Sequence, residues 1–286
     1  MLLAAAIPHH STSTRVHGPL LHGVLADVSA RWATPAELVA AAHDAAGRAE
    51  IEAAAADAPT VPLAEATLLP PVPEPQRILC AGVNYAAHAV EGGRSGDRQP
   101  HPAVFTRFAS SLVGHGQPVE RPAVSAHFDY EGELAVVIGR RARSLDVADA
   151  LTVVAGYTCF MDGSVRDFQR HRDQWIPGKN FDNSGAMGPW IVTADEVGDP
   201  AALHLTTAVN GEVLQDAPTA DMIHSIAEIV AYCSAFTTLE AGDVIATGTP
   251  SGVGFARTPP RWLQPGDTVT VTITGVGTLT NTVVDA

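Results

Sequence analysis

Two glutamates stand at the start of an apolar run, where a core strand would normally carry hydrophobic side chains. Glu131 and Glu133 open the segment 131–139 and are two residues apart. In an extended chain, side chains at that spacing point to the same face, with Cβ atoms about 6–7 Å apart. Because two like charges that close need a counter-ion, the pattern predicts a cation site at this strand.

A third carboxylate follows a second apolar segment. The β-branched run 153–160 predicts a strand, and Asp162 comes just after it, where an aspartate can also be a simple cap. Three carboxylates without a neighbouring histidine or cysteine select a hard cation, Mg²⁺ or Mn²⁺ with Ca²⁺ as a substitute, and disfavour zinc. Three protein oxygens leave about three positions of an octahedron open for water or substrate, as catalysis requires.

Two further segments carry groups that could move or stabilise charge. His88 and Glu91 are three residues apart, which on a helix places both on one face, where the carboxylate can fix the imidazole tautomer. A surface ion pair is the alternative interpretation. Lys179 lies among apolar residues and glycine and is expected to point inward, the alternative being a lysine whose charge extends to solvent. The glycines and charges at 92–98 favour a loop, so the His88 pair is expected on a lid.

These groups need a framework, and the composition favours strands. The chain has 286 residues, with 21 prolines and 25 glycines, and is 46% hydrophobic. This length predicts one substantial domain with a small accessory segment, and this composition predicts short strands and many turns. We therefore expect an α+β, β-rich fold.

The N-terminal part has its own pattern. Strands at 2–7 and 20–26, joined through a polar turn at 9–14, predict a hairpin. Thr34 followed by Pro35 predicts the start of an Ala-rich helix that runs to about residue 56. The proline-rich segment 68–75 predicts a linker. From these features we predict a small N-terminal α/β domain at 1–75 and a catalytic domain at 76–286.

Charge and cysteine content exclude several classes of function. The formal charge of −14 repels nucleic acid and anionic lipid, so neither is expected as a partner. The three cysteines form no metal or disulfide spacing, which favours reduced thiols and the cytoplasm. No segment approaches the ~20 apolar residues of a membrane span, and residues 1–7 lack the basic region of a signal peptide.

Taken together, the motifs resemble those of the fumarylacetoacetate hydrolase family, from about residue 77 to the C-terminus. They are similar in particular to the branch that contains acylpyruvate hydrolases and oxaloacetate decarboxylases. The residues that carry the resemblance are Asn84-Tyr85 with His88 and Glu91, the Glu131 and Glu133 pair, Gly156-Tyr157-Thr158 leading to Asp162, then Arg166, Asp167 and Gln169, Gly178-Lys179, Asn210-Gly211-Glu212, and Thr247 to Gly254.

The resemblance implies a fold and roles. It implies a mixed β-sandwich or roll as the catalytic domain, a homodimer, and a divalent metal held by Glu131, Glu133 and Asp162. His88, oriented by Glu91, would activate water, and Lys179 would stabilise developing negative charge. The implied substrate contacts are Arg166, Gln169, Thr249 and Arg107, the last standing where the family commonly has lysine.

The implied reaction is hydrolysis of a carbon–carbon bond in a 1,3-dioxo acid of the acylpyruvate or fumarylpyruvate type. Decarboxylation of a β-keto acid such as oxaloacetate is the first alternative, since it needs an enolate but no water. Isomerisation or hydration of a 2-oxo-hepta-3-ene-dioate is the next. A non-catalytic protein that retains the fold is a different class, which the presence of the acids, the His88 pair and Lys179 disfavours.

Overall fold

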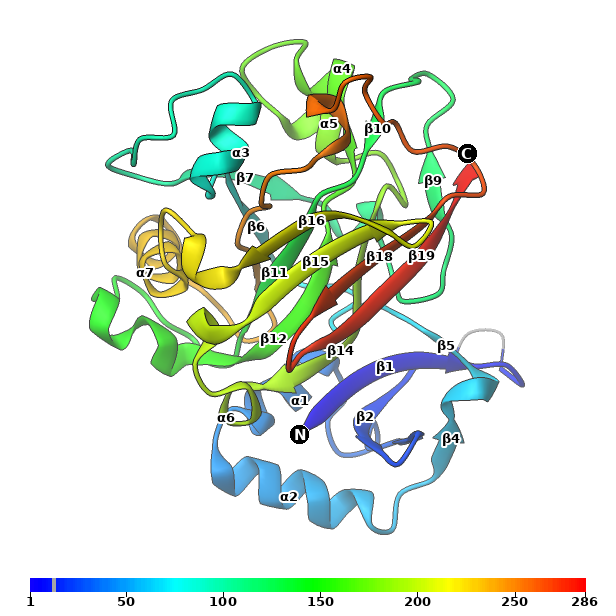
Figure 1. Cartoon of the computed structure of the whole chain (residues 1–286). Helices are drawn as coiled ribbons and strands as arrows, with labels where there is room; N and C mark the ends of the chain where they lie inside the picture. Colours follow the sequence, from blue (N-terminus) through cyan, green and yellow to red (C-terminus); the bar gives the residue numbers. More distant parts are fainter. Residues whose placement is uncertain (12–13) are drawn as a thin grey trace.

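The computed structural model describes residues 1–11 and 14–286 and consists mainly of two sheets that pack against each other (Figure 1). The larger sheet has the strand order β4-β3-β2-β1-β14-β12-β11-β17-β6-β7, with β5 beside β1 and β8 beside β14. Its strands are β1 (Leu2–Pro8), β2 (Val16–Leu21), β3 (Val24–Ala26), β4 (Thr60–Pro62), β5 (Ala66–Leu68), β6 (Ile78–Gly82), β7 (Ala103–Arg107), β8 (Leu112–Val113), β11 (Gly132–Ile138), β12 (Val154–Met161), β14 (Gly185–Thr193) and β17 (Val244–Ala246).

The second sheet covers one face of the first. It has the order β16-β15-β18-β19-β9, and Figure 1 shows its yellow and red strands lying across the green strands of the larger sheet. Its strands are β9 (Val119–Arg121), β15 (His204–Val209), β16 (Glu212–Pro218), β18 (Thr268–Ile273) and β19 (Gly277–Asp285), and a separate pair is formed by β10 (Phe128–Asp129) and β13 (Ser164–Val165). The α+β, β-rich fold predicted from the sequence is confirmed, and the two packed sheets agree with the mixed β-sandwich or roll that the family resemblance implied.

The centre of the larger sheet positions the acidic residues. Every residue of β11 and of β12 is buried, and the two strands are antiparallel, with Gly132 opposite Met161 and Glu133 opposite Phe160. The start of β11 and the end of β12 therefore lie side by side in the middle of the sheet. The acidic residues of both chain segments are brought together at these strand ends.

Short helices flank the sheets. The α-helices are α1 (Pro35–Ala42), α2 (Ala45–Ala55), α3 (Ala86–Glu91), α4 (Arg166–Gln169), α5 (Ile176–Lys179), α6 (Ala194–Val197) and α7 (Ile226–Phe236), and 3-10 turns cover Leu63–Glu65, Ala109–Ser111, Val147–Val153, Pro200–Ala202, Thr219–Asp221 and Gly254–Ala256. Helix α7 begins after Ser225, whose side chain accepts from Glu228 N in a capping box.

Two expectations for the N-terminal region were wrong in detail. The hairpin of β1 and β2 is present, although residues 12–13 of its turn lie outside the described part of the chain. The strand expected at 20–26 is two strands, because His22 (φ 50°) and Gly23 (φ 84°) turn the chain back. The single Ala-rich helix is two helices, because Asp44 caps a new one by accepting from Gly47 N.

The N-terminal strands continue the central sheet: Leu2 of β1 lies opposite Val192 of β14. The segment between β5 and β6 has no regular structure, as the prolines predicted. The domain boundary at residue 75 stays a prediction. Among the described residues, no helix is long and apolar enough to cross a bilayer.

Candidate active site

The three carboxylates predicted as metal ligands lie together. Each of Glu131, Glu133 and Asp162 offers an oxygen within 4.8 Å of the others, and all three are buried. Glu131 precedes β11, Glu133 is its second residue, and Asp162 follows β12. The paired strand ends thus fix the cluster without help from any flexible segment.

Glu131 is neutralised by two cations. Lys179 Nζ lies 2.6 Å from its Oε2, and Arg166 Nη1 lies 2.6 Å from its Oε1. Burial pushes the pKa of Glu131 upward, but the charges of Lys179 and Arg166 outweigh this effect and hold the pKa below its ordinary value. Glu131 is therefore ionised in the folded protein.

Glu133 has a different environment. Its Oε2 accepts a hydrogen bond from Gly248 N at 2.8 Å, and within the described part of the chain no cationic side chain forms an ion pair with it. Burial, followed by the charges of Asp162 and Glu131, raises its pKa well above the ordinary value. The loop that donates this bond needs a glycine, because Gly248 has φ 99° and a Cβ there would meet the Asn84 Cβ at 2.7 Å.

The chemistry of this donor set fits a divalent cation. A fourth buried carboxylate, Asp129, is ion-paired with Arg166. The site therefore contains four buried carboxylates and three buried cations, which are Arg107, Arg166 and Lys179. Glu133 is the carboxylate of this set that has no cationic partner among the described residues. Oxygen ligands with a net negative charge are what Mg²⁺ or Mn²⁺ require, so the cluster could bind a metal.

Arg107 is not among the residues that line the cavity, and the substrate contact implied for it stays a prediction. Its guanidinium is buried beneath Asp162, to which Nη1 is ion-paired, and it also donates to Ser184 Oγ and to the Gly163 carbonyl. Because both oxygens of Asp162 are occupied, one by Arg107 and the other by Lys179 at 2.6 Å, Arg107 orients this carboxylate from behind.

Lys179 points inward as predicted and is the only lysine in the chain. Its side chain is 2% exposed, and its ammonium group bridges Glu131 and Asp162 beside the ring of Phe105. Burial lowers its pKa, but Asp162 and Glu131 outweigh burial and raise the pKa above the ordinary value. A permanent positive charge is thereby held against the carboxylate cluster.

His88 and Glu91 lie on one face of α3, as their spacing predicted. His88 Nδ1 is 2.8 Å from Glu91 Oε1, and Glu91 Oε2 accepts from Gly252 N at 2.8 Å. The carboxylate therefore fixes the proton on Nδ1 and leaves Nε2 as the free nitrogen. The interpretation as an isolated surface pair is excluded, because His88 is 9% exposed and lines the same cavity as Glu131 and Glu133.

The backbone conformation at the end of β6 directs the chain into α3, which carries His88 to the carboxylates. Val83, which follows β6, has φ 56°, a left-handed conformation that is rare for a β-branched residue. The next residue, Asn84, is buried and its side chain bonds the carbonyls of His224 and Thr247 and the His224 N–H. The three hydrogen bonds of the Asn84 side chain thus stabilise the strained backbone conformation of the neighbouring Val83.

The remaining predicted contacts surround the cluster. Arg166, Gln169 and Thr249 all line the cavity, and Gln169 Oε1 accepts from Arg166 Nη1 at 3.0 Å. The Thr249 hydroxyl donates to the Gly132 carbonyl and accepts from Gln215 Nε2. Their substrate-binding roles stay predictions.

Sequence reasoning missed Asp129. It is fully buried, bonds Arg166 Nε at 2.8 Å and accepts from the N–H groups of Gly254 and Phe255. Its spacing gave a usable signal, since Asp129 stands two residues before Glu131 just as Glu133 stands two after it. Asp129 holds Arg166 against Glu131 and anchors the loop that carries Phe255.

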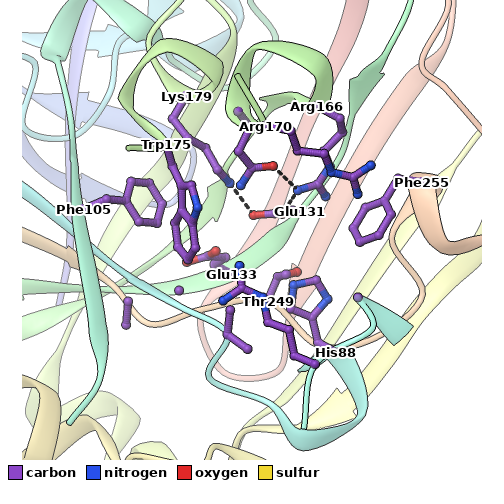
Figure 2. Close-up of a pocket in the computed structure, with 16 residues that line it drawn as sticks. His88, Phe105, Glu131, Glu133, Arg166, Arg170, Trp175, Lys179, Thr249 and Phe255 are labelled. Atoms are coloured by element: carbon purple, nitrogen blue, oxygen red, sulfur yellow. Dashed lines mark hydrogen bonds and ion pairs between the residues drawn. The ribbon is translucent and has the colours of Figure 1, made fainter. Parts of the chain in front are cut away.

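His88, Glu131, Glu133, Arg166 and Lys179 line one cavity of about 120 Å³, whereas Asp129, Asp162 and Arg107 are not among its lining residues. Figure 2 shows Phe105 and Trp175 on one side of the carboxylates and His88 with Phe255 on the other. The cavity combines a buried anionic cluster, fixed cations and one free imidazole nitrogen. This set can bind a small polyanion together with a metal and transfer a proton.

Comparison with known proteins agrees with this site. Residues 77–284 match the family described as Fumarylacetoacetate (FAA) hydrolase C-terminal. The chain is 44% identical to oxaloacetate tautomerase YisK of Bacillus subtilis over 221 residues, which is 77% of this chain and 73% of that protein. It is 42% identical to the human mitochondrial oxaloacetate tautomerase FAHD2A, over 81% of this chain and 74% of the relative.

A solved structure extends the likeness to the whole chain. Maleylpyruvate hydrolase from Sphingobium sp. SYK-6, described in complex with manganese(II) and pyruvate, superposes with a TM-score of 0.82 at 34% identity and covers 100% of both chains. Family match, relatives and fold agree with the motifs identified in the sequence. The chain therefore belongs to the fumarylacetoacetate hydrolase family.

Proposed function

We propose that this protein is a metal-dependent enzyme that transfers a proton at C3 of a small 2-oxo acid, and that its reaction is the keto–enol tautomerisation of an oxaloacetate-type dicarboxylic acid. The observation that carries the proposal is the His88–Glu91 pair. It presents one free imidazole nitrogen to the cavity in which the carboxylates and Lys179 are held. A base beside a fixed positive charge is the arrangement that enolisation needs.

The residues that would hold the metal are Glu131, Glu133 and Asp162. When bound, Mg²⁺ or Mn²⁺ supplies a Lewis acid for the carboxylate and keto oxygens of a 2-oxo acid. Mn²⁺ gains support from the manganese(II) described in the maleylpyruvate hydrolase complex.

The protein's own groups account for the proton transfer. His88 Nε2 accepts the proton from C3 while Glu91 stabilises the imidazolium through Nδ1–H. The charge of Lys179 favours the negative charge that develops on the C2 oxygen. Returning the proton to that oxygen gives the enol, so one proton moves and no carbon–carbon bond breaks.

The relatives favour tautomerisation over carbon–carbon cleavage. The Bacillus subtilis and human relatives, at 44% and 42% identity, are oxaloacetate tautomerases, whereas the maleylpyruvate hydrolase is 34% identical.

Hydrolysis of a 3-acylpyruvate is the second candidate. It is supported by the likeness to maleylpyruvate hydrolase, and His88 could equally deprotonate a water that attacks the distal carbonyl. Proton transfer at carbon is common to both reactions, so only the products distinguish them.

The test offers oxaloacetate and acetylpyruvate to the purified protein with Mg²⁺, with Mn²⁺ and with EDTA. Enol absorbance reports tautomerisation, and NMR detects pyruvate, CO2 and acetate. Metal-dependent interconversion of the keto and enol forms without pyruvate supports the proposal. Pyruvate with CO2 from oxaloacetate would assign a decarboxylase, and pyruvate with acetate from acetylpyruvate would assign a hydrolase.

Assembly and location remain part of the proposal. We expect a homodimer, as the family resemblance implies, and a cytoplasmic protein. Light scattering after size exclusion measures the molar mass, and fractionation of the source cells locates the protein.

A further inference from the structure

Two arginines of the cavity differ from the other cationic side chains of the site. Arg107, Arg166 and Lys179 are each ion-paired with buried carboxylates. Arg94 and Arg170 line the same cavity and are exposed, and within the described part of the chain neither forms an ion pair. In a protein with a formal charge of −14, two cations left without acidic partners at one cavity are available for an anionic ligand.

Arg94 reaches across the cavity. It belongs to the loop that follows α3, yet its guanidinium carbon lies 5.4 Å from the centre of the Trp175 ring, on the segment before α5. Trp175 is itself fixed, because its ring packs edge-on to Phe105 and fills the space that a side chain at Gly82 would occupy. The stacked guanidinium is thus held in place, and its N–H groups have no hydrogen-bond partner among the residues that the structure describes.

Arg94 also separates two cavities. A second cavity of about 200 Å³ adjoins the catalytic one, and Gly82, Val83 and Arg94 line both. The far wall of the second cavity includes Asp97, His101 and His224. Of the three shared residues, Arg94 alone has a long side chain, so its position decides whether the two spaces are joined.

The proposed chemistry specifies where the far end of a substrate lies. If the 2-oxo acid end meets the carboxylate cluster and Lys179, and C3 meets His88, then C4 continues away from the cluster on the α3 side of the cavity. Arg94 is six residues beyond His88 in the chain and crosses this side. Arg170 instead stacks on Phe255, with its guanidinium carbon 4.7 Å from the ring centre.

We propose that Arg94 binds the C4 carboxylate of the substrate and closes the catalytic cavity against the adjoining one, which makes it the residue that selects short dicarboxylic 2-oxo acids. This inference rests on the proposed function and adds its substrate class. A charge-assisted, bidentate contact of guanidinium with carboxylate is lost when that carboxylate is esterified.

The experiment compares oxaloacetate with its 4-methyl and 4-butyl esters, which keep the 2-oxo acid end and lack the distal charge. We expect the Mn²⁺-loaded wild-type protein to prefer oxaloacetate over the methyl ester by about 10–100-fold in kcat/KM for C3 proton exchange. Arg94→Met should reduce this preference to within about threefold and should raise activity on the butyl ester, which can then extend into the second cavity. Arg94→Lys should keep part of the preference.

Two control variants make the result specific. Arg143→Met removes an exposed arginine that lines neither cavity and should keep the full preference. Arg170→Met changes the other unpaired arginine of the same cavity and should keep most of it. The proposal is overturned if Arg94→Met retains the preference, or if Arg143→Met or Arg170→Met loses it to the same extent.

A failure of the proposed function gives a different result. If none of the compounds exchanges its C3 proton, the tautomerase proposal fails, and the role of Arg94 is decided by calorimetric titration of the Mn²⁺-loaded protein. Tighter binding of oxaloacetate than of the methyl ester, lost in Arg94→Met, supports Arg94 as the carboxylate ligand. Equal binding of the two compounds by the wild type overturns it.

Discussion

The floor and the lid of the cavity are built in different ways. The floor consists of Glu131 and Glu133, with Asp162 beside them, at the ends of two fully buried strands, and each of these residues is at most 5% exposed. The lid is α3, a six-residue helix in which Val90 is 62% exposed, followed by an exposed loop. The floor is part of the core, so its charges affect stability as well as chemistry, whereas the lid carries His88, the proton-transfer group that we propose.

The largest expected effect is at the floor. Glu133→Gln should reduce activity by about 10³–10⁴-fold, because a ligand of the Lewis acid is lost. Calorimetric titration with Mn²⁺ should show weakened binding in the same variant. Full activity with unchanged Mn²⁺ affinity would exclude Glu133 as a ligand.

The same variant should have the opposite effect on the stability of the metal-free protein. Since the pKa of Glu133 is raised in the folded state, the unfolded chain ionises first, and the wild type loses stability as pH rises above about 4.3. Glu133→Gln removes this penalty, so its Tm in EDTA at pH 7 should exceed that of the wild type. An equal decline of both proteins between pH 4 and 7 would contradict this account.

A substitution of His88, on the lid, should change the reaction rate and leave stability and metal affinity unchanged. His88→Asn should lower the rate by about 10²–10⁴-fold through loss of the base. Because His88 is outside the carboxylate cluster, Mn²⁺ affinity and Tm should stay close to the wild-type values. A fall in Tm as large as that of a floor variant would show that the lid is part of the core.

Arg107 tests whether the floor is also structural. Arg107→Met removes one of the two cations that are paired with the buried Asp162 and should lower the free energy of unfolding by about 3–5 kcal/mol, measured in urea. The conservative variant Arg107→Lys should retain part of this stability. A normal stability with a raised KM would instead make Arg107 the substrate contact first expected from the sequence.

Glu91→Gln should be milder than the loss of His88. The amide can still contact Nδ1 and Gly252 but no longer stabilises an imidazolium, so we expect a rate about 10–100-fold lower. The pH profile of kcat should shift as well, a change that a purely structural role would not produce. An unchanged rate and profile would leave His88 acting without Glu91.

The smallest effect is expected at an exposed ion pair that links the loop after α3 to α7. Arg98 pairs with Glu228 of α7 at 2.6 Å, and their side chains are 52% and 33% exposed. Arg98→Gln should therefore change the free energy of unfolding by less than about 1 kcal/mol in urea. A loss comparable to that of Arg107→Met would make the lid as firmly held as the floor.

The same contrast explains what the sequence could predict. The i, i+2 spacing of Glu131 and Glu133 and the i, i+3 spacing of His88 and Glu91 are local patterns, and both geometries were predicted correctly. Asp162 was found because it ends an apolar strand. The role of Arg107 depends on a contact 55 residues away in the chain, which no local spacing encodes.

The N-terminal region shows the same limit. The strand expected at 20–26 and the long Ala-rich helix had the right composition, but single residues, Gly23 and Asp44, ended them. Arg94 stacks on Trp175, a residue far away in the chain, and no local spacing predicts this contact.

The most direct test of the central claim follows oxaloacetate in deuterium oxide by NMR, with Mn²⁺-loaded wild type and with His88→Asn. The account predicts that the wild type accelerates deuterium incorporation at C3 without releasing pyruvate, and that His88→Asn loses about 10²–10⁴-fold of this acceleration. Exchange at the uncatalysed rate in the wild type, or undiminished exchange in His88→Asn, would contradict it.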